Sequence, residues 1–139
     1  MNGIDMFREV IDLKTDERIE ILDITPEIQF IVAKSSCKTG IVNVYSRHST
    51  SGIVVNENEI GLLEDFQCIL ERLVPENENY QHNMIDNNAD SHIRSFFIGN
   101  SEVIPVNNEK LDLGTWQSLF FVELDGPRNR EVTVTVFGD

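Results

Sequence analysis

The sequence predicts a mixed α+β fold built around a largely antiparallel sheet or sandwich. Three observations support this fold class. Short segments alternate apolar and polar residues with the period of two that strands show, one stretch near the middle carries a helical apolar stripe, and turn residues divide the C-terminal third. The 139 residues contain no internal repeat or low-complexity segment, so we expect one domain spanning residues 1–139.

The first half of the chain is expected to contain four strands. In residues 7–13, Phe7, Ile11 and Leu13 share one alternating face, which is typical of a half-buried strand. A second strand is expected at residues 18–24. Two more, at 41–45 and 52–56, are joined by a polar connection that carries His48. This connection places His48 at the end of a strand, where a rigid scaffold can hold a catalytic side chain.

A first helix is expected after residue 24. Thr25 is suited to cap it, Pro26 to occupy its first position and Glu27 to interact with its dipole. Gly40, shortly after Lys38, is the expected stop.

The strongest helix signal lies at residues 60–73 and ends before Pro75. Its apolar stripe is expected to pack in the core and consists of Leu62, Leu63, Phe66, Ile69, Leu70 and Leu73. Cys68, which lies within this pattern, is expected to be a small buried hydrophobe. A shorter helix is expected at residues 91–98, with Asp90 or Ser91 as its cap and Gly99 at its end.

After residue 102 we expect a meander of hairpins. Its strands are expected at residues 102–106, 110–114, 117–123 and 131–136. In the last of these, Val132, Val134 and Val136 alternate with threonines, which predicts one buried and one polar face.

Composition excludes several function classes. There are 24 acidic and 11 basic residues, for a net charge of −13. Such a surface repels phosphates, so we expect no nucleic-acid partner. No stretch approaches the roughly 18 apolar residues of a membrane span, and no signal peptide is apparent. The two cysteines lie far apart, which suits a reducing compartment, and we expect a cytoplasmic protein.

All three histidines lie in polar settings. A single histidine of this kind is usually a surface or capping residue, but His48, His82 and His92 are each flanked by amides, hydroxyls or carboxylates. This pattern suits metal ligation or general acid–base work. Three converging imidazoles would form a typical Zn²⁺ site with an open position for water. The separations of 34 and 10 residues do not force convergence, so only the fold can bring the rings together.

Several motifs in this sequence, taken together and in order, resemble the YjbQ family. The resemblance covers nearly everything from about residue 6 to the C-terminus. The residues that carry it are His48-Ser-Thr-Ser-Gly-Ile-Val-Val-Asn-Glu-Asn58, Leu73-Val-Pro75, Tyr80-Gln-His82, Asp90-Ser-His92-Ile93, Gly99-Asn-Ser101, Pro105, Leu111-Asp-Leu-Gly-Thr-Trp-Gln117, Glu123 and Gly126-Pro-Arg128.

The resemblance implies a small α+β sandwich with two or three helices that forms a homotrimer, with a polar pocket around the histidines near the subunit boundary. It also implies a secondary thiamine-phosphate synthase activity, which couples a hydroxymethylpyrimidine pyrophosphate to a thiazole phosphate. The residues carried over as catalytic are His48, Glu57, His82 and His92, and the same three histidines would hold a divalent metal, Zn²⁺ or Mg²⁺. Those carried over as substrate-binding are Asn56, Thr115, Trp116, Gln117 and Arg128.

Two of these residues have a common alternative role. Most tryptophans are core aromatics, although Trp116 follows Gly114 at a strand start and could also form a pocket wall. Arg128 lies in a turn, where an arginine is more often an exposed base than a phosphate clamp.

The sequence departs from the family pattern at three places. Ser49 replaces the usual Thr, Ile60-Gly61 stands where Asp-Pro is common, and Ile85-Asp86-Asn87 replaces an acidic residue followed by Gly in the loop before His92. The third change affects a segment that could supply Asp86 as a ligand or as a partner for a histidine ring.

Two hypotheses of function follow. The first is the thiamine-phosphate synthase, in which a metal and Arg128 neutralise the pyrophosphate. The second is a trimer that binds a metal or a small metabolite without this catalysis. Basic charge at the pocket discriminates between them, because two anionic substrates must enter a chain of net charge −13.

Overall fold

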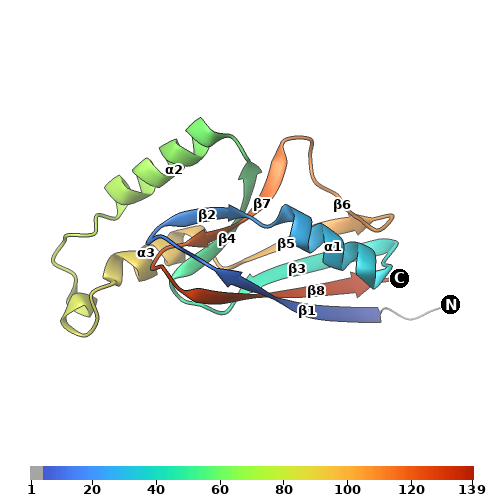
Figure 1. The fold of residues 1–139 in the computed structure, drawn as a ribbon, viewed down its shortest axis with the longest axis horizontal. Helices are drawn as coiled ribbons and strands as arrows, with labels where there is room; N and C mark the ends of the chain where they lie inside the picture. Colours follow the sequence, from blue (N-terminus) through green and yellow to red (C-terminus); the bar gives the residue numbers. More distant parts are fainter. Residues whose placement is uncertain (1–4) are drawn as a thin grey trace.

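Two antiparallel sheets form the frame of the molecule in the computed structural model, which describes residues 5–139 (Figure 1). The larger sheet has the order β1 (Asp5–Lys14), β8 (Asn129–Gly138), β3 (Thr39–Ser46), β5 (Ser101–Asn107) and β6 (Lys110–Leu111). The smaller sheet has the order β2 (Glu20–Asp23), β7 (Gln117–Glu123) and β4 (Ser51–Glu57). The predicted α+β class with largely antiparallel pairing is confirmed.

Three α-helices accompany the sheets within the described residues. They are α1 (Thr25–Ser35), α2 (Ile60–Leu73) and α3 (Ala89–Ile98), and a single 3-10 turn, η1 (Gln81–Met84), precedes α3. None of these helices is long and apolar enough to cross a membrane.

The main core lies between the two sheets and α1. It is formed by apolar side chains of β3, β5 and β8 from the larger sheet, by Ile53, Leu119 and Phe121 from the smaller sheet, and by one face of α1. The predicted alternation in β8 is confirmed at its valines, because Val132, Val134 and Val136 are buried. On β1, Phe7, Ile11 and Leu13 pack against the same core, also as predicted.

The predicted C-terminal meander is wrong. Only β5 and β6 form a hairpin, because β7 joins β2 and β4 in the other sheet while β8 inserts between β1 and β3. The reason lies in β7 itself. Residues 119–123 are buried on both faces, which requires a central strand with core on one side and further apolar cover on the other.

Both ends of α1 also differ from the predictions. α1 begins at Thr25 itself, whose hydroxyl accepts a hydrogen bond from Leu119 N (2.8 Å) and so joins the helix to β7 instead of capping it. The helix stops at Ser35, with Ser36 in the left-handed conformation (φ 59°). Gly40 lies within β3, where an added Cβ would sit 1.9 Å from the Phe137 carbonyl oxygen. Gly40 therefore permits a close strand approach and is not the helix stop.

Helix α2 has the predicted limits but not the predicted burial. Of its apolar stripe only Leu70 is buried, and Ile69 and Leu73 are 51% and 59% exposed. The helix packs on the smaller sheet through Leu70 and Phe66, whereas Leu62 and Leu63 border an open cavity between the helix and the sheet. Cys68, predicted to be buried, is exposed, and the buried cysteine is Cys37.

Replacement of Phe121 by alanine tests the position of the core. Phe121 is fully buried between the sheets, so Phe121→Ala should lower the free energy of unfolding by about 3–5 kcal/mol. Phe30→Ala, at a position that is 67% exposed, should cost less than about 1 kcal/mol. Urea denaturation of the two variants measures both values, and equal costs would contradict this assignment of the core.

Candidate functional site

Two of the three histidines lie together. His82 belongs to η1 and His92 to α3, and their ring centroids are 4.8 Å apart with an angle of 76° between the ring planes. Both side chains are partly buried. The predicted convergence is therefore present for this pair.

His48 lines a different surface depression from His92. It shares that depression with residues of β1 and β8, whereas His92 lines one with Ser49, Ser95 and Phe96. The Glu131 backbone amide donates a hydrogen bond to His48 Nε2 (2.9 Å). Burial and the nearby Arg130 charge lower the pKa of His48, so its ring is neutral and its lone pair is already used.

The full three-histidine metal set is not assembled within one chain. No group of three or more His, Cys, Asp or Glu residues within residues 5–139 is close enough to hold a metal ion. The pair formed by His82 and His92 is the part of the predicted set that this chain brings together by itself.

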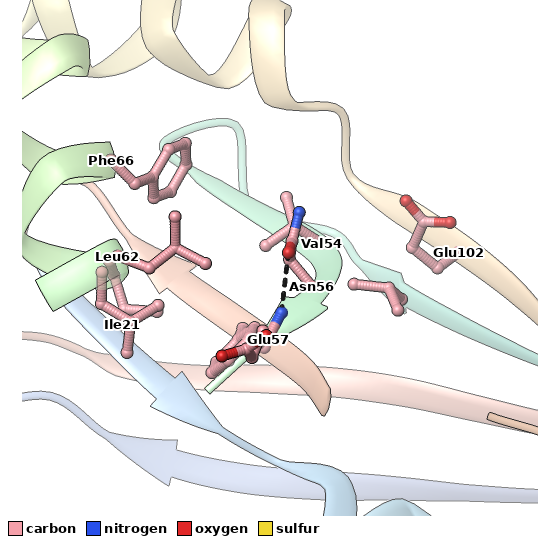
Figure 2. A pocket seen from close by; sticks show the side chains of 10 residues that line it. Ile21, Val54, Asn56, Glu57, Leu62, Phe66 and Glu102 are labelled. Atoms are coloured by element: carbon pink, nitrogen blue, oxygen red, sulfur yellow. Dashed lines mark hydrogen bonds between the residues drawn. The ribbon is translucent and has the colours of Figure 1, made fainter. Parts of the chain in front are cut away.

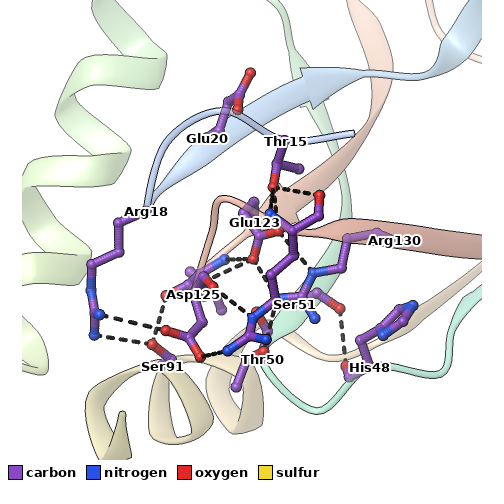
Figure 3. A network of polar contacts seen from close by, with 12 residues as sticks. Thr15, Arg18, Glu20, His48, Thr50, Ser51, Ser91, Glu123, Asp125 and Arg130 are labelled. Carbon is purple, nitrogen blue, oxygen red and sulfur yellow. Dashed lines mark hydrogen bonds and ion pairs between the residues drawn. The ribbon is translucent and has the colours of Figure 1, made fainter. Parts of the chain in front are cut away.

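A buried ion pair lies beside the histidines. The side chains of Glu123, at the end of β7, and Arg130, in β8, are 0% and 4% exposed (Figure 3). Arg130 Nε donates to Glu123 Oε1 (2.8 Å), and its NH2 group donates to the Thr50 hydroxyl (2.8 Å). Thr15 donates its own hydroxyl to Glu123 Oε1 (2.8 Å). This pair therefore joins β7, β8, the end of β1 and the connection that carries His48.

Electrostatics keep Glu123 ionised. Burial by itself would raise the pKa of Glu123, but hydrogen bonds from Arg130, the Asp125 amide and Thr15 outweigh it and hold the pKa below its ordinary value. The charge of Arg130 acts in the same direction.

A second group of charges holds α3 in place. Asp90, at 1% exposure, accepts from Arg18 NH2 (2.8 Å) and pairs with Arg94 NH1 (3.2 Å). Arg94 also donates to the Val74 carbonyl oxygen (2.7 Å). Ser91 donates to the Leu124 carbonyl oxygen (2.6 Å). Asp90 and Ser91 are thus used for packing, which explains why neither caps α3 as predicted, and Asn88 is the N-cap residue.

This charged group reaches the histidine pair through Asp125 and Asn88. Asp125 pairs with Arg18 (3.5 Å) and with Arg128 (2.9 Å). Asn88 Nδ2 donates to Asp125 Oδ2 (2.9 Å), and Asn88 Oδ1 lies 3.1 Å from His82 Nε2. A continuous set of polar contacts therefore extends from two arginines to the His82 ring.

Sequence reasoning missed this network, although two signals were available. Arg130 has the same parity as Val132, Val134 and Val136, so the period of two already places it on the buried face of β8. Asp90 and Arg94 are four apart, which puts them on one face of α3. Arg128, the arginine predicted to bind substrate, has a side chain that is 51% exposed and already paired with Asp125.

The remaining predicted residues lie at the other end of the smaller sheet. Glu57 pairs with Gln117 and Asn56 with Ser118, whereas Ser51 and Glu123 pair at the histidine end. Six residue steps of about 3.3 Å separate Ser51 from Glu57, so the two ends of β4 lie about 20 Å apart. One chain alone cannot bring them to a common small ligand.

A cavity of about 360 Å³ opens at this other end between α2 and the sheet (Figure 2). Apolar side chains such as Leu62, Phe66 and Val54 line most of it, with Asn56, Glu57 and Glu102 at its polar side. The Asn56 side chain accepts a hydrogen bond from the Glu57 amide (2.8 Å).

The loop before β7 extends into solvent. Trp116 is 73% exposed and Thr115 is also exposed, so Trp116 is not a core aromatic and within one chain does not line this cavity. Gln117 accepts from the Gly114 amide (2.8 Å), which closes the turn. Asp86 is exposed, and its amide donates to the His82 carbonyl oxygen (3.0 Å).

Comparison with known proteins decides the family. The model for the family described as "UPF0047 protein YjbQ-like" matches residues 9–139. The chain belongs to the YjbQ family. A UPF0047 protein of Methanothermobacter thermautotrophicus is 50% identical over 97% of this chain and 94% of its own length. The UPF0047 protein YugU of Bacillus subtilis is 32% identical over 94% of this chain and 98% of its own.

A crystal structure supports the same conclusion for the fold. The structure of a protein from Sulfolobus solfataricus P2, described as YbjQ-like and of unknown function, superposes with a TM-score of 0.96. The two sequences are 40% identical, and the match covers 99% of this chain and all of the other. The YjbQ fold is therefore established for this chain.

The buried ion pair predicts a specific pH dependence of stability. The pKa of Glu123 is lowered in the folded protein, so its contribution is complete at pH 7 and is lost as the pH falls from about 4.5 through the folded pKa. Glu123→Gln should cost about 3–5 kcal/mol at pH 7, because Arg130 stays buried without its counter-charge.

Chemical denaturation at a series of pH values measures this effect. The difference between wild type and Glu123→Gln should shrink between pH 5 and pH 3. Glu131, the exposed residue after Arg130, provides the control: the stability of Glu131→Gln should follow that of the wild type at every pH. A difference that stays constant over this range would contradict the role of Glu123.

Proposed function

We propose that this protein is a homotrimer whose paired histidines, His82 and His92, bind a divalent metal ion at a site that a neighbouring subunit completes. The observation that carries the proposal is the separation of 4.8 Å between the two ring centroids. Two imidazoles that bind one tetrahedral Zn²⁺ through bonds of about 2.0–2.1 Å have centroids about 5 Å apart. The pair is therefore already spaced for a shared ion.

The donor atoms favour Zn²⁺ over Mg²⁺. Imidazole nitrogens suit zinc, whereas Mg²⁺ requires oxygen ligands in a near-ideal octahedron. The net charge of −13 also favours a cation over an anion near the surface. When bound, such an ion would supply Lewis acidity and a water of lowered pKa.

Two observations support the homotrimer. Asn56 and Glu57 lie at the far end of β4, about 20 Å along the strand from Ser51, and a neighbouring subunit is the simplest way to bring such residues to the histidine pair. Large apolar side chains are also exposed on α2 and α3, among them Leu73 at 59% and Phe97 at 66%. Large exposed apolar side chains gathered in patches mark association sites.

In the assembled trimer, the residues assigned from the family pattern keep their proposed roles. The catalytic set is His48, Glu57, His82 and His92, and a small-molecule ligand would contact Asn56, Thr115, Trp116, Gln117 and Arg128.

The thiamine-phosphate synthase activity is the second candidate. The half-exposed Arg128 favours it, because this guanidinium lies next to Asp125 and could turn toward a phosphate. The ion pairs near the histidines argue against the synthase, because they neutralise the basic charge that its anionic substrates need. The arginines paired with carboxylates are Arg18, Arg94, Arg128 and Arg130. We therefore place metal binding first.

Metal binding is tested by substituting one ring. Purified protein should bind Zn²⁺ in isothermal titration calorimetry, and His82→Ala should weaken binding at least tenfold because half of the donor pair is lost. Gln81→Ala, at the exposed neighbouring position, should bind as the wild type does. Equal affinity of wild type and His82→Ala would exclude this pair as the site.

The same preparations decide between the two candidate functions. Thiamine-phosphate formation from the two phosphorylated precursors is measured with and without Zn²⁺ and Mg²⁺. Thiamine-phosphate formation that requires His82 would support the synthase. If the protein binds Zn²⁺ but forms no thiamine phosphate with either metal, only the metal-binding function is supported.

The trimer is tested by mass and by the environment of Trp116. Sedimentation equilibrium should give three times the chain mass. Acrylamide quenching of Trp116, the single tryptophan, should be weaker than its 73% exposure in one chain implies, because the neighbouring subunit would cover it. A monomeric mass together with a freely quenched tryptophan would contradict the shared site.

A further inference from the structure

Asn88 lies at the junction between the histidine pair and the charged network. Its side chain is in contact with His82 on one side and Asp125 on the other, at 3.1 Å and 2.9 Å, and the residue is only 7% exposed. A buried amide between two fixed partners has no freedom to turn without breaking both contacts.

The partners fix the orientation of this amide. The Asp125 carboxylate is paired with Arg18 and Arg128, and a carboxylate only accepts hydrogen bonds. The Asn88 NH₂ group must therefore face Asp125, which turns Oδ1 toward His82. Because an amide oxygen only accepts, His82 Nε2 must carry the proton of this contact. A neutral imidazole has a single N–H, so Nδ1 of His82 holds the free lone pair.

The helix cap supplies a second, independent observation. Asn88 is the N-cap of α3, a position where an asparagine side chain normally accepts from an amide of the first turn. Among the residues that the structure describes, Asn88 makes no such bond, and its side chain is used between His82 and Asp125 instead. Its backbone carbonyl accepts from the His92 amide (3.3 Å), so the same residue also starts the helix that carries the second histidine.

We propose that Asn88 is a positioning residue that holds His82 as the Nε2–H tautomer and so presents Nδ1 as the ligand-binding nitrogen. This inference rests on the proposed metal site for its purpose, but the tautomer is a property of the protein without metal. Removing a polar group that orients a metal-binding histidine commonly lowers the metal affinity 10–100-fold.

The tautomer can be observed directly by nuclear magnetic resonance. In protein labelled with ¹⁵N-histidine at pH 8, long-range ¹H–¹⁵N spectra distinguish the protonated ring nitrogen from the bare one. His82 of the wild type should show a single tautomer with the proton on Nε2. That proton should also exchange slowly with water, because it is held against a buried amide.

Three variants separate positioning from a merely structural role. Asn88→Leu removes the acceptor, so the slowly exchanging Nε2–H signal should disappear, both tautomers should be populated and Zn²⁺ affinity should fall about 10–100-fold. Asp125→Asn keeps the shape but no longer dictates the amide orientation, so it should also give a tautomer mixture. Asn87→Ala, at the exposed adjacent residue, should leave the tautomer and the exchange rate unchanged.

The outcomes distinguish this inference from the proposed function. A proton on Nδ1 of His82 in the wild type, or an unchanged Nε2–H signal in Asn88→Leu, would overturn the role of Asn88 even if Zn²⁺ binds. The expected tautomer without any Zn²⁺ binding would overturn the metal site and leave the role of Asn88 in ring orientation standing. If Asn88→Leu does not fold, the wild-type tautomer and Asp125→Asn decide the question.

Discussion

The buried ion pair between Glu123 and Arg130 is the interaction on which the arrangement of this molecule depends. A buried pair contributes little net stability compared with apolar residues of the same volume, but losing one partner is costly, so its main effect is on which arrangement forms. Here Glu123 accepts a hydrogen bond from the Thr15 hydroxyl, and Arg130 donates one to the Thr50 hydroxyl. It thereby ties the two sheets to the connection that carries His48, and a different strand register would leave at least one charge buried alone.

Further polar contacts connect the neighbourhood of this ion pair to His82. Asp90 and Asp125 share Arg18, and Asn88 transmits the position of Asp125 to the His82 ring. Asp90 and Asp125 are each paired with arginines, and the Asn88 amide is bonded at both ends, which stabilises a buried polar network. Arg18 Nε is the exception, because within residues 5–139 it makes no hydrogen bond and lies 3.7 Å from Glu76. A ring held in this way has a defined orientation before any ligand arrives, and preorganised donors of this kind are what a binding site needs.

Local patterns predicted the elements better than they predicted the neighbours of each element. The period of two located β1, β4, β7 and β8, and the helical stripe located α2, because these signals depend only on residues close in sequence. The partners of β7 and the exposure of α2 depend on contacts between distant segments, for which one sequence contains no direct signal. His82 and His92 were selected for their polar settings, and their proximity followed from the packing of η1 beside α3. Asn88 was not selected because its role is visible only once Asp125, 37 residues away, is placed beside it.

The exposed apolar face of α2 and the division of the motif residues have one explanation in common. In a monomer, Ile69, Leu73 and Phe97 are exposed to water, which costs free energy. Burial of these side chains against another chain would remove that cost. A monomer would also leave Asn56 and Glu57 at the end of β4 that lies about 20 Å along the strand from Ser51, where they could not share a ligand with the histidine pair. The proposed trimer would cover the apolar faces and join the two groups, and so would account for both features. The apolar surface would then provide the association energy, and the rigid polar network would determine the geometry of the site formed between the chains.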